Sequence, residues 1–328
     1  SRVEPMLYPL TFQPIFQERV WGGRNLESLF GKPLPADKRI GESWEISDRP
    51  GAESIIANGP LAGLSLRWLM EEHAEELLGN VPDRNGRFPW LAKLLDAEAD
   101  LSVQVHPPAE IAHALGGESK TEAWYIAHAT PEARIIAGLP EDMTRDTFAE
   151  RLGQPGFADC LHAIPAEADK ALFIPSGRLH ALGAGTVVFE IQEDSDTTYR
   201  VYDWDRTGLN GQPRELHVEQ ALASIDFTDT TPALATPEWE AAEGHSVSPI
   251  AHQPGVFDLS LVRLEDSATQ LCPGEGMRVL AVTHGTLTIH AGEEPLRLEA
   301  GGFALLPASV EAAGLEGEKA QFLLTQGA

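Results

Sequence analysis

Residues 101–108, LSVQVHPP, constrain the fold of this chain more than any other segment. Apolar and polar residues alternate strictly until two prolines end the run, which predicts a strand with one buried face. The polar face carries Ser102, Gln104 and His106, where an ordinary half-buried strand has threonine, lysine or glutamate. Gln104 and His106 lie two residues apart on this face and are a candidate pair of metal ligands. The alternative at this point is a surface strand that happens to carry a histidine.

The bulk composition limits both the fold and the partners. A length of 328 residues suffices for two domains or one large β-rich domain, and 30 glycines and 24 prolines are typical of short strands joined by turns. A formal net charge of -26 argues against nucleic acid or an anionic membrane as a partner. Cys160 and Cys272 form neither a disulfide framework nor a C-x-x-C zinc site, which fits a reducing compartment. No apolar run reaches the roughly 18 residues of a membrane span, and no signal-peptide pattern is present, so we expect a soluble cytoplasmic protein.

Other segments with alternating or apolar patterns predict the remaining elements. Predicted strands lie at 41–47, 88–96, 120–127, 171–175, 187–192 and 197–204, and predicted helices at 64–79, 109–115, 142–163 and 215–225. Lys93 interrupts an apolar run, and such a lysine is more often at an edge or snorkelling than a pocket cation.

The pattern also predicts a division of the chain. Residues 1–227 are expected to form the first domain, with helical excursions at about 64–79 and 142–163. Residues 228–255 are rich in Thr, Pro, Ala and Glu, and we interpret them as a linker or a segment that returns to the first domain. Residues 256–328 contain short strands separated by turns, which predicts a small β-barrel or sandwich.

A second motif, PSGRLH at 175–180, has the form P-x-G-x-x-H. Gly177 permits a tight turn, and His180 then begins the next strand and faces inward. The motif resembles the turn that supplies a metal-binding histidine in cupin barrels. The alternative is an ordinary turn with an exposed histidine. Glu122 adds a carboxylate to the alternating strand at 120–127, on the same face as Lys120 and Trp124.

Gln104, His106, Glu122 and His180 thus offer nitrogen and oxygen ligands from three segments of the chain. This ligand set suits zinc or another first-row divalent ion. The absence of thiolate ligands argues against a purely structural zinc. The same set with an open position is what a catalytic or substrate-binding metal requires.

Several stretches of the chain resemble the signature segments of type I mannose-6-phosphate isomerases, most closely those of the short bacterial form. These stretches are QVHP at 104–107, KTE at 120–122, GRLHALG at 177–183 and SDTTYR at 195–200, with WGG at 21–23 and GESWE at 41–45 as N-terminal landmarks. The matching segments span about residues 8–227, and the C-terminal third fits the family's second, metal-free barrel only in outline. An ordinary cupin has H-x-H followed closely by Glu. Here Gln104 takes the first position and Glu122 follows a long loop, which is how these isomerases differ.

The resemblance implies a mainly β fold of cupin (double-stranded β-helix, or jelly-roll) barrels, one catalytic and one degenerate, with small helical insertions. It also implies one zinc ion per chain and the interconversion of mannose 6-phosphate and fructose 6-phosphate. The implied zinc ligands are Gln104, His106, Glu122 and His180. The implied catalytic residues are Arg200, which is the essential arginine, Lys120 and Asp196.

An aldose–ketose isomerase that uses a cis-enediol intermediate needs an acid/base near C1 and C2 and a positive charge beside the developing enediolate. Arg200 stays charged and is our candidate for that charge. Lys120 is the acid/base candidate if zinc and Arg200 lower its pKa, and Asp196 or His106 is the candidate for opening the sugar ring. The alternative for Arg200 is a structural salt bridge with an acidic neighbour. The three candidate partners are Asp194, Asp196 and Asp203.

A phosphate site is harder to predict because the chain has no P-loop. The candidate substrate-binding residues are Ser102, Lys93 and Arg178, with Lys120 and Arg24 as further cations, and Trp44, Trp124 and Tyr202 as possible walls of the sugar site. The expected partner is a small sugar phosphate, and the chain is expected to be a monomer or a small homo-oligomer. Rival functions are a metal-dependent dioxygenase, an isomerase of an unphosphorylated aldose, and a cupin that binds sugar without catalysis.

Overall fold

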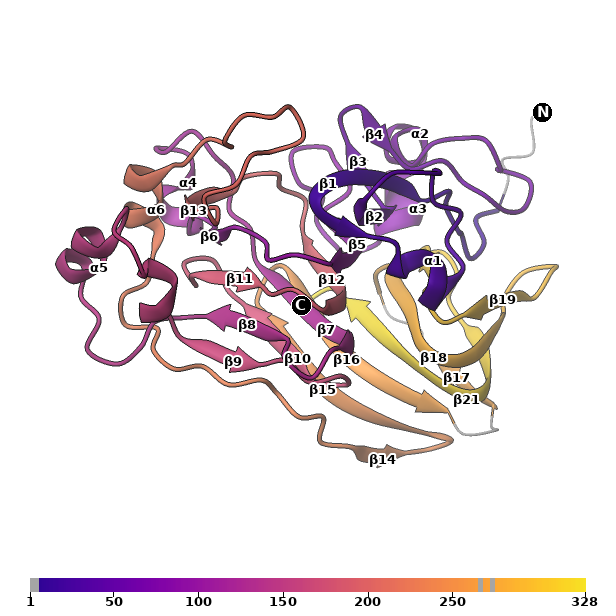
Figure 1. Ribbon diagram of the computed structural model, residues 1–328. Helices are drawn as coiled ribbons and strands as arrows, with labels where there is room; N and C mark the ends of the chain where they lie inside the picture. Colours follow the sequence, from indigo (N-terminus) through magenta and orange to yellow (C-terminus); the bar gives the residue numbers. More distant parts are fainter. Residues whose placement is uncertain (1–5, 265–267, 272–274) are drawn as a thin grey trace.

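A computed structural model of the chain describes residues 6–264, 268–271 and 275–328, and it is mainly β, as the sequence predicts (Figure 1). The first barrel consists of two antiparallel sheets. The six-stranded sheet has the order β1 (Ile15–Gly23), β2 (Ile40–Ile46), β5 (Trp90–Ala97), β12 (Thr186–Glu193), β7 (Glu122–Ala129) and β10 (Ala171–Ile174). The five-stranded sheet has the order β13 (Tyr199–Tyr202), β6 (Val103–Val105), β11 (His180–Leu182), β8 (Arg134–Ala137) and β9 (Ala163–Pro165).

The C-terminal strands form a third sheet, drawn in orange and yellow in Figure 1. Its order is β14 (Glu240–Ala242), β15 (His245–Gln253), β16 (Phe257–Leu264), β21 (Ala313–Gln326), β18 (Arg278–His290) and β19 (Leu296–Glu299), with β17 (Ala268–Leu271) paired to β21 and β20 (Phe303–Leu306) paired to β18. A short hairpin joins β3 (Asp48–Arg49) and β4 (Ala52–Glu53). The helices are α1 (Asn25–Phe30), α2 (Leu66–Glu72), α3 (Ala74–Leu78), α4 (Ala109–Ala112), α5 (Arg145–Arg151), η1 (Phe157–Cys160, 3-10) and α6 (Val218–Ser224). This arrangement confirms the cupin fold that the resemblance implies.

The inner faces of the first two sheets pack against each other. Trp124 and Val188 of the six-stranded sheet share a buried cluster with Ile135 and Leu182 of the five-stranded sheet. Side chains two residues apart lie on the same face of a strand, so the residues in step with Trp124 and Val188 also point into the barrel. Polar residues at these inward positions therefore have no access to solvent except through the barrel itself.

The outer face of the five-stranded sheet is covered by helices. Val103 and Val105 of β6 pack in one cluster with Phe148 of α5 and Ala221 of α6. Because these two valines point outward, Gln104 between them points into the barrel. The prediction that this strand has one apolar face and one polar face is therefore confirmed, and its polar face belongs to the barrel interior.

The outer face of the six-stranded sheet packs against the C-terminal sheet. Phe189 of β12 is fully buried, and its ring stacks on Phe303 of β20 with centroids 5.7 Å apart and an interplanar angle of 22°. The two rings belong to one buried cluster that also contains residues of β5, β16 and β18. Aromatic burial of this kind ties the two barrels into one packed unit.

Phe189→Ala is expected to lower the free energy of unfolding by about 3–5 kcal/mol, because it removes a ring that both barrels contact and leaves a cavity. Urea denaturation followed by fluorescence measures the change. Leu216→Ala serves as the control, since Leu216 is 47% exposed and surface substitutions have small effects. A loss for Phe189→Ala no larger than that of the control would contradict the prediction.

The structure departs from the predicted elements in three places. The helix predicted at 64–79 is two helices, α2 and α3, that meet at His73, which caps the end of the first and the start of the second. The segment 228–255, predicted as a linker or a return to the first domain, contains β15, which pairs with β16. Bridges between Leu139 and Thr230 and between Ala171 and Ala235 join the same segment to the first barrel. The expectation that Lys93 lies at an edge or snorkels is wrong, since β5 is a central strand between β2 and β12 and Lys93 is buried.

None of the described helices combines the length and the apolar character that a membrane crossing requires. Cys160 is a free thiol, and Cys272 lies outside the described residues.

Candidate active site

A cavity of about 720 Å³ lies in the first barrel and is lined by both of its sheets. The six-stranded sheet contributes Lys93, Glu122 and Glu190, and the five-stranded sheet contributes Gln104 and Arg200. Each of these side chains comes from an inward position of its strand. The volume is that of a small-molecule site, and its lining is polar and charged.

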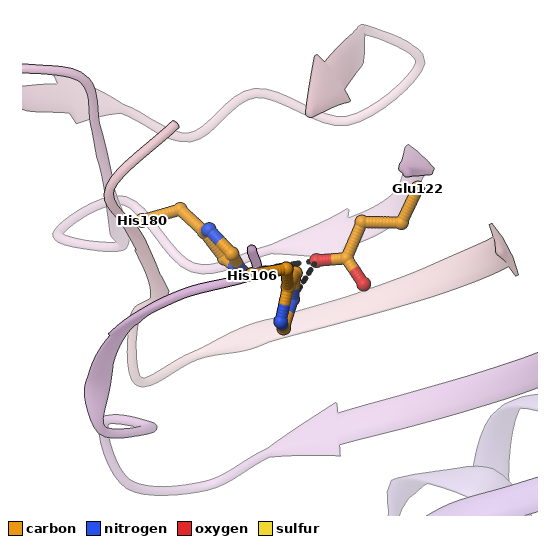
Figure 2. Close-up of side chains that lie close together, drawn as sticks. All are labelled: His106, Glu122 and His180. Carbon is orange, nitrogen blue, oxygen red and sulfur yellow. Dashed lines mark hydrogen bonds and ion pairs between the residues drawn. The ribbon is translucent and has the colours of Figure 1, made fainter. Parts of the chain in front are cut away.

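Three of the predicted metal ligands converge beside this cavity (Figure 2). One carboxylate oxygen of Glu122, Oε1, lies 3.0 Å from His180 Nε2 and 3.4 Å from His106 Nε2. All three side chains are buried. Donor atoms of a tetrahedral site with bonds of about 2.0–2.1 Å lie about 3.3 Å apart. The spacing of these donor atoms therefore fits a first-row divalent ion.

The hydrogen bonds of the two imidazoles show which nitrogens are free to bind a cation. His106 Nδ1 lies 3.0 Å from the Thr197 carbonyl oxygen, and His180 Nδ1 lies 2.8 Å from the Arg178 carbonyl oxygen. A carbonyl only accepts, so each Nδ1 carries a proton, and Nε2 is the nitrogen of each ring that faces Glu122. In a neutral ring this Nε2 has a lone pair that can bind a cation, and a cation between the rings and the carboxylate would attract both. Such outer hydrogen bonds are typical of metal-binding histidines.

Gln104 completes the set of four predicted ligands. Its amide nitrogen lies 3.4 Å from His180 Nε2, while its Oε1 accepts from Ser102 Oγ at 3.2 Å. The two amide orientations differ only in which atom faces His180. With the amide turned over, Oε1 faces the lone pairs of the histidines, as metal ligation requires, and Ser102 Oγ accepts from the amide nitrogen.

The charges of the ligand cluster follow from its burial. Burial, and then the nearby Lys120 ammonium, lower the pKa of His106 to about 3, against the opposing effect of Glu122. Burial raises the pKa of Glu122, but His106 and Lys120 outweigh burial and hold it well below its usual value. These shifts favour a neutral His106 and an ionised Glu122, the forms in which such side chains bind metals. Burial, and then the adjacent Glu122 carboxylate, raise the pKa of Glu190.

Arg200 lines the same cavity from β13, and it forms no ion pair with any described residue. Its Nη1 donates to the Glu215 carbonyl at 3.5 Å, and its Nε is buried without a partner. Burial, and then the neighbouring Arg214, lower the pKa of Arg200. The cavity therefore holds a cation with hydrogen-bonding capacity to spare.

The alternative of a structural salt bridge for Arg200 is wrong, because none of its three candidate partners, all within the described residues, forms an ion pair with it. Asp194 pairs with Arg87 at 3.0 Å, and Asp203 pairs with Arg214 at 2.7 Å. Asp196, the third candidate, lines the cavity together with Arg200.

The predicted acid/base and phosphate residues differ in whether they line the cavity. Lys120 and Ser102 line the cavity, and Lys120 Nζ lies 3.7 Å from Glu122 Oε2. Lys93 also lines it, but its Nζ pairs with Glu42 Oε1 at 2.9 Å. Arg178 does not line the cavity. Its guanidinium forms a two-point ion pair with Asp229 at 2.8 and 2.9 Å, so the prediction that it binds substrate is wrong.

The aromatic candidates and Arg24 also differ in whether they line the cavity. Trp44 and Trp124 line the cavity, whereas Tyr202 packs in the cluster under the helices. Arg24 does not line the cavity and is paired with the exposed Glu27.

Several cavity residues were missed by the sequence analysis. They are Glu18, Arg19, Glu42, Glu190, Arg214 and His217. Glu190 and Glu42 each interrupt a buried strand at an inward position, as Lys93 does, and this signal was available. The remaining residues come from β1 and from the 208–217 loop, whose approach to the cavity has no local signature.

Glu42 is expected to contribute stability that is lost in acid. Burial raises its pKa, but Lys93 at 2.9 Å and Arg19 at 2.8 Å outweigh burial and lower it from 4.5 to about 2. A carboxyl group whose pKa is lower in the folded state stabilises above its ordinary pKa, and that stability disappears as pH falls from 4.5 to about 2. The contribution above this range is about 3 kcal/mol.

The measurement is the free energy of unfolding as a function of pH, for the natural chain and for Glu42→Gln. We expect a shallower pH dependence below pH 4.5 for the variant, because its side chain cannot take up a proton. Equal slopes below that pH would contradict the lowered pKa.

Comparisons with known proteins show which family the chain belongs to. The sequence model of the phosphomannose isomerase type I catalytic domain matches residues 10–119. The mannose-6-phosphate isomerase of Streptococcus mutans is 34% identical over 319 residues, which cover 95% of this chain and 96% of that protein. A probable mannose-6-phosphate isomerase of Bacillus subtilis is 43% identical over 222 residues, 67% of this chain and 69% of that protein.

Solved structures extend the likeness to the whole fold. The crystal structure of the mannose 6-phosphate isomerase from Bacillus subtilis superposes with a TM-score of 0.87 at 31% identity, covering 98% of this chain and 100% of that one. The phosphomannose isomerase of Salmonella typhimurium, as an H99A mutant, shares the fold with a TM-score of 0.79 at 20% identity. The full-length relatives and the solved structure support one assignment, with which the catalytic-domain match agrees: the chain belongs to the mannose-6-phosphate isomerase family.

Proposed function

We propose that the chain is a zinc-dependent isomerase that interconverts mannose 6-phosphate and fructose 6-phosphate. The observation that carries this proposal is the convergence of His106, Glu122 and His180 on one point beside a cavity. The same cavity holds Arg200, which has no ion-pair partner among the described residues. Family membership supplies the substrate, since the full-length relatives are mannose-6-phosphate isomerases. Zinc is favoured over calcium or magnesium because half of the ligand set is imidazole.

We propose Gln104, His106, Glu122 and His180 as the zinc ligands. These residues would hold a zinc ion whose positive charge would polarise and orient the sugar oxygens. The chain's own residues then supply the proton transfers. The reaction removes a proton from C2 of the aldose and delivers one to C1, while the O2 proton leaves and O1 gains one, through a cis-enediolate.

Arg200 is our candidate for stabilising the enediolate charge. It has no carboxylate partner among the described residues, and it is partly desolvated, which strengthens its interaction with an anion. Lys120 and Asp196 line the same cavity and are the candidates for the proton transfers and for ring opening. Ser102 and Lys93 remain candidates for binding the sugar phosphate, although Glu42 already neutralises Lys93.

The test combines metal analysis of the purified chain with a coupled assay for fructose 6-phosphate. We expect about one zinc per chain, turnover of mannose 6-phosphate, little turnover of mannose, and loss of turnover on chelation that zinc restores. Turnover of mannose alone would favour an isomerase of unphosphorylated sugars. Binding of the sugar phosphate without turnover would favour a sugar-binding cupin and would contradict the proposal.

A second measurement addresses the intermediate. A reaction run in deuterium oxide is expected to place deuterium at C1 of fructose 6-phosphate, because the proton on the catalytic base exchanges with solvent. Complete retention of the substrate hydrogen would favour direct hydride transfer and would count against the enediolate.

A further inference from the structure

Two loops carry candidate catalytic residues into the cavity. Residues 118–121 precede β7 and carry Lys120, and residues 194–197 follow β12 and carry Asp196. The loops are joined to each other by hydrogen bonds: Glu118 N donates to Thr197 Oγ1 at 3.0 Å, and Ser195 Oγ donates to the Glu118 carbonyl at 3.3 Å. Movement of one loop therefore moves the other.

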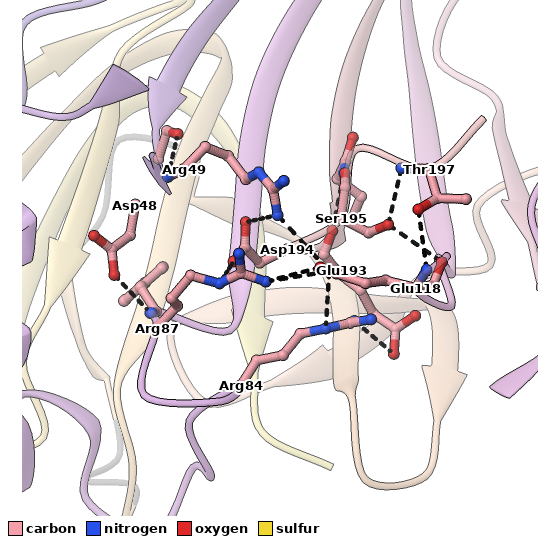
Figure 3. Close-up of polar contacts among 12 residues, drawn as sticks. Asp48, Arg49, Arg84, Arg87, Glu118, Glu193, Asp194, Ser195 and Thr197 are labelled. Carbon is pink, nitrogen blue, oxygen red and sulfur yellow. Dashed lines mark hydrogen bonds and ion pairs between the residues drawn. The ribbon is translucent and has the colours of Figure 1, made fainter. Parts of the chain in front are cut away.

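Three arginines hold this pair of loops from outside (Figure 3), and we call Arg49, Arg84 and Arg87 the arginine clamp. Arg87 binds both loops at short range. Its Nε lies 3.0 Å from Asp194 Oδ2, and its Nη2 lies 3.1 Å from Glu118 Oε2. Arg49 reaches the same two carboxylates at 3.5 and 3.7 Å.

Arg84 completes the clamp at the base of the loops. Its Nη2 donates to the Ser119 carbonyl at 2.7 Å, and its Nη1 lies 3.4 Å from Glu193 Oε1. Backbone hydrogen bonds between Arg84 and Arg87, at 2.9 and 3.1 Å, close the turn that presents both guanidinium groups. None of the three arginines lines the cavity, so their effect on a substrate there must pass through the loops.

The clamped loop also touches a metal ligand. The Thr197 carbonyl accepts from His106 Nδ1 at 3.0 Å, and the Thr197 N–H donates to Ser195 Oγ at 3.2 Å. This contact sets the tautomer and the ring orientation of His106. A continuous path of contacts therefore runs from Arg87 through Asp194 and its loop to His106.

The electrostatics indicate that Arg87 is the central member. Asp194 has a side chain that is 1% exposed. Burial raises the pKa of its carboxyl, and Arg87 is the strongest opposing influence, ahead of Arg49. The clamp balances its three positive charges with Glu118, Glu193 and Asp194. Without Arg87 a buried carboxylate loses its closest partner, which is far more costly than losing an exposed pair.

We propose that Arg87 is a positioning residue for this site: by binding Asp194 and Glu118 together, it holds the Thr197 carbonyl against His106 and holds Lys120 and Asp196 in the cavity. The proposal rests on the proposed zinc-dependent isomerase function. It assigns Arg87 no contact with substrate. Its effect should therefore appear both in metal affinity and in kcat.

The test compares Arg87→Gln and Arg87→Lys with the natural chain, using zinc competition against a chelator and the coupled isomerase assay. Loss of an outer partner of a metal-binding histidine typically costs about 10- to 100-fold in metal affinity or activity. We expect losses in that range for Arg87→Gln in both measurements. Arg87→Lys should be intermediate, because lysine keeps the charge but cannot bridge two carboxylates with one planar group.

Leu280→Ala is the matched control for loss of stability. Leu280 is fully buried in the C-terminal barrel, in a cluster that contains no cavity residue. Once fully folded, this variant should keep natural zinc affinity and kcat. If folded Arg87→Gln also keeps both, or if Arg87→Lys is no better than Arg87→Gln, the positioning role is overturned.

The double variant Arg87→Gln/Asp194→Asn tests the path itself. If Arg87 acts through Asp194, the effects on zinc affinity should not add. Additive losses would overturn the path through Asp194. If the natural chain binds zinc but does not isomerise the sugar phosphate, the proposed function fails, and the zinc competition still tests Arg87 on its own.

Discussion

Glu122→Gln is expected to remove the bound metal and the isomerase turnover together. Glu122 supplies the only carboxylate in the proposed ligand set, and its Oε1 lies within 3.4 Å of both histidine Nε2 atoms. Glutamine has almost the same shape but carries no charge to offset that of the cation. Removal of an outer hydrogen-bond partner costs about 10- to 100-fold in metal affinity or activity, and we expect a larger loss of metal affinity here.

Metal content after dialysis and kcat from the coupled assay measure this effect. Glu316→Gln is a suitable control, because Glu316 is exposed and pairs with an exposed histidine on the C-terminal sheet. Full metal content with near-natural turnover in Glu122→Gln would show that Glu122 is not a ligand. Lost turnover with full metal content would assign Glu122 a different role in the reaction.

Arg200→Ala is expected to lower kcat by about 10²–10³-fold, the usual cost of removing a donor that stabilises developing negative charge. The metal should remain bound, because no described contact joins Arg200 to the side chain of a proposed ligand. Arg200→Lys should recover part of the activity, since lysine restores charge without the planar fork. The two variants thus separate charge from geometry.

Parallel measurements of kcat, KM and metal content distinguish this role from simple substrate binding. A rise in KM with kcat unchanged would place Arg200 on the phosphate instead of the enediolate. Near-full turnover of Arg200→Ala would exclude both roles. Arg263→Ala controls for the lost positive charge, because Arg263 stacks on Trp239 with 3.9 Å to the ring centroid, away from the cavity.

The strands and the ligand candidates were predictable because they depend on local patterns. Alternation at 101–106 placed Gln104 and His106 on the polar face, and the packing of Val103 and Val105 under the helices confirms that face. The P-x-G-x-x-H motif also predicts the turn correctly, since Gly177 has a φ of 92°, a conformation that favours glycine. His180 follows this turn at the first position of β11.

Pairing between charges was less predictable, because it joins residues far apart in the sequence. Lys93 and Glu42 are 51 residues apart, and Arg178 and Asp229 are also 51 apart, so no local pattern relates either pair. The strand inside the predicted linker or return segment was not predictable for a related reason. Residues 245–253 have a weak pattern of their own and become a strand through pairing with β16.

The sequence therefore predicts the alternating strand, the glycine turn and the inward carboxylate of Glu122. It does so because side-chain direction repeats every two residues along a strand. The convergence of these groups depends on how the two sheets face each other. The ion pairing of each cation also depends on how the sheets face each other. Lys93 and Arg178 are neutralised by carboxylates, whereas Arg200 has no ion-pair partner among the described residues. Electrostatic interactions depend on distance in space, and only the closed barrel sets those distances.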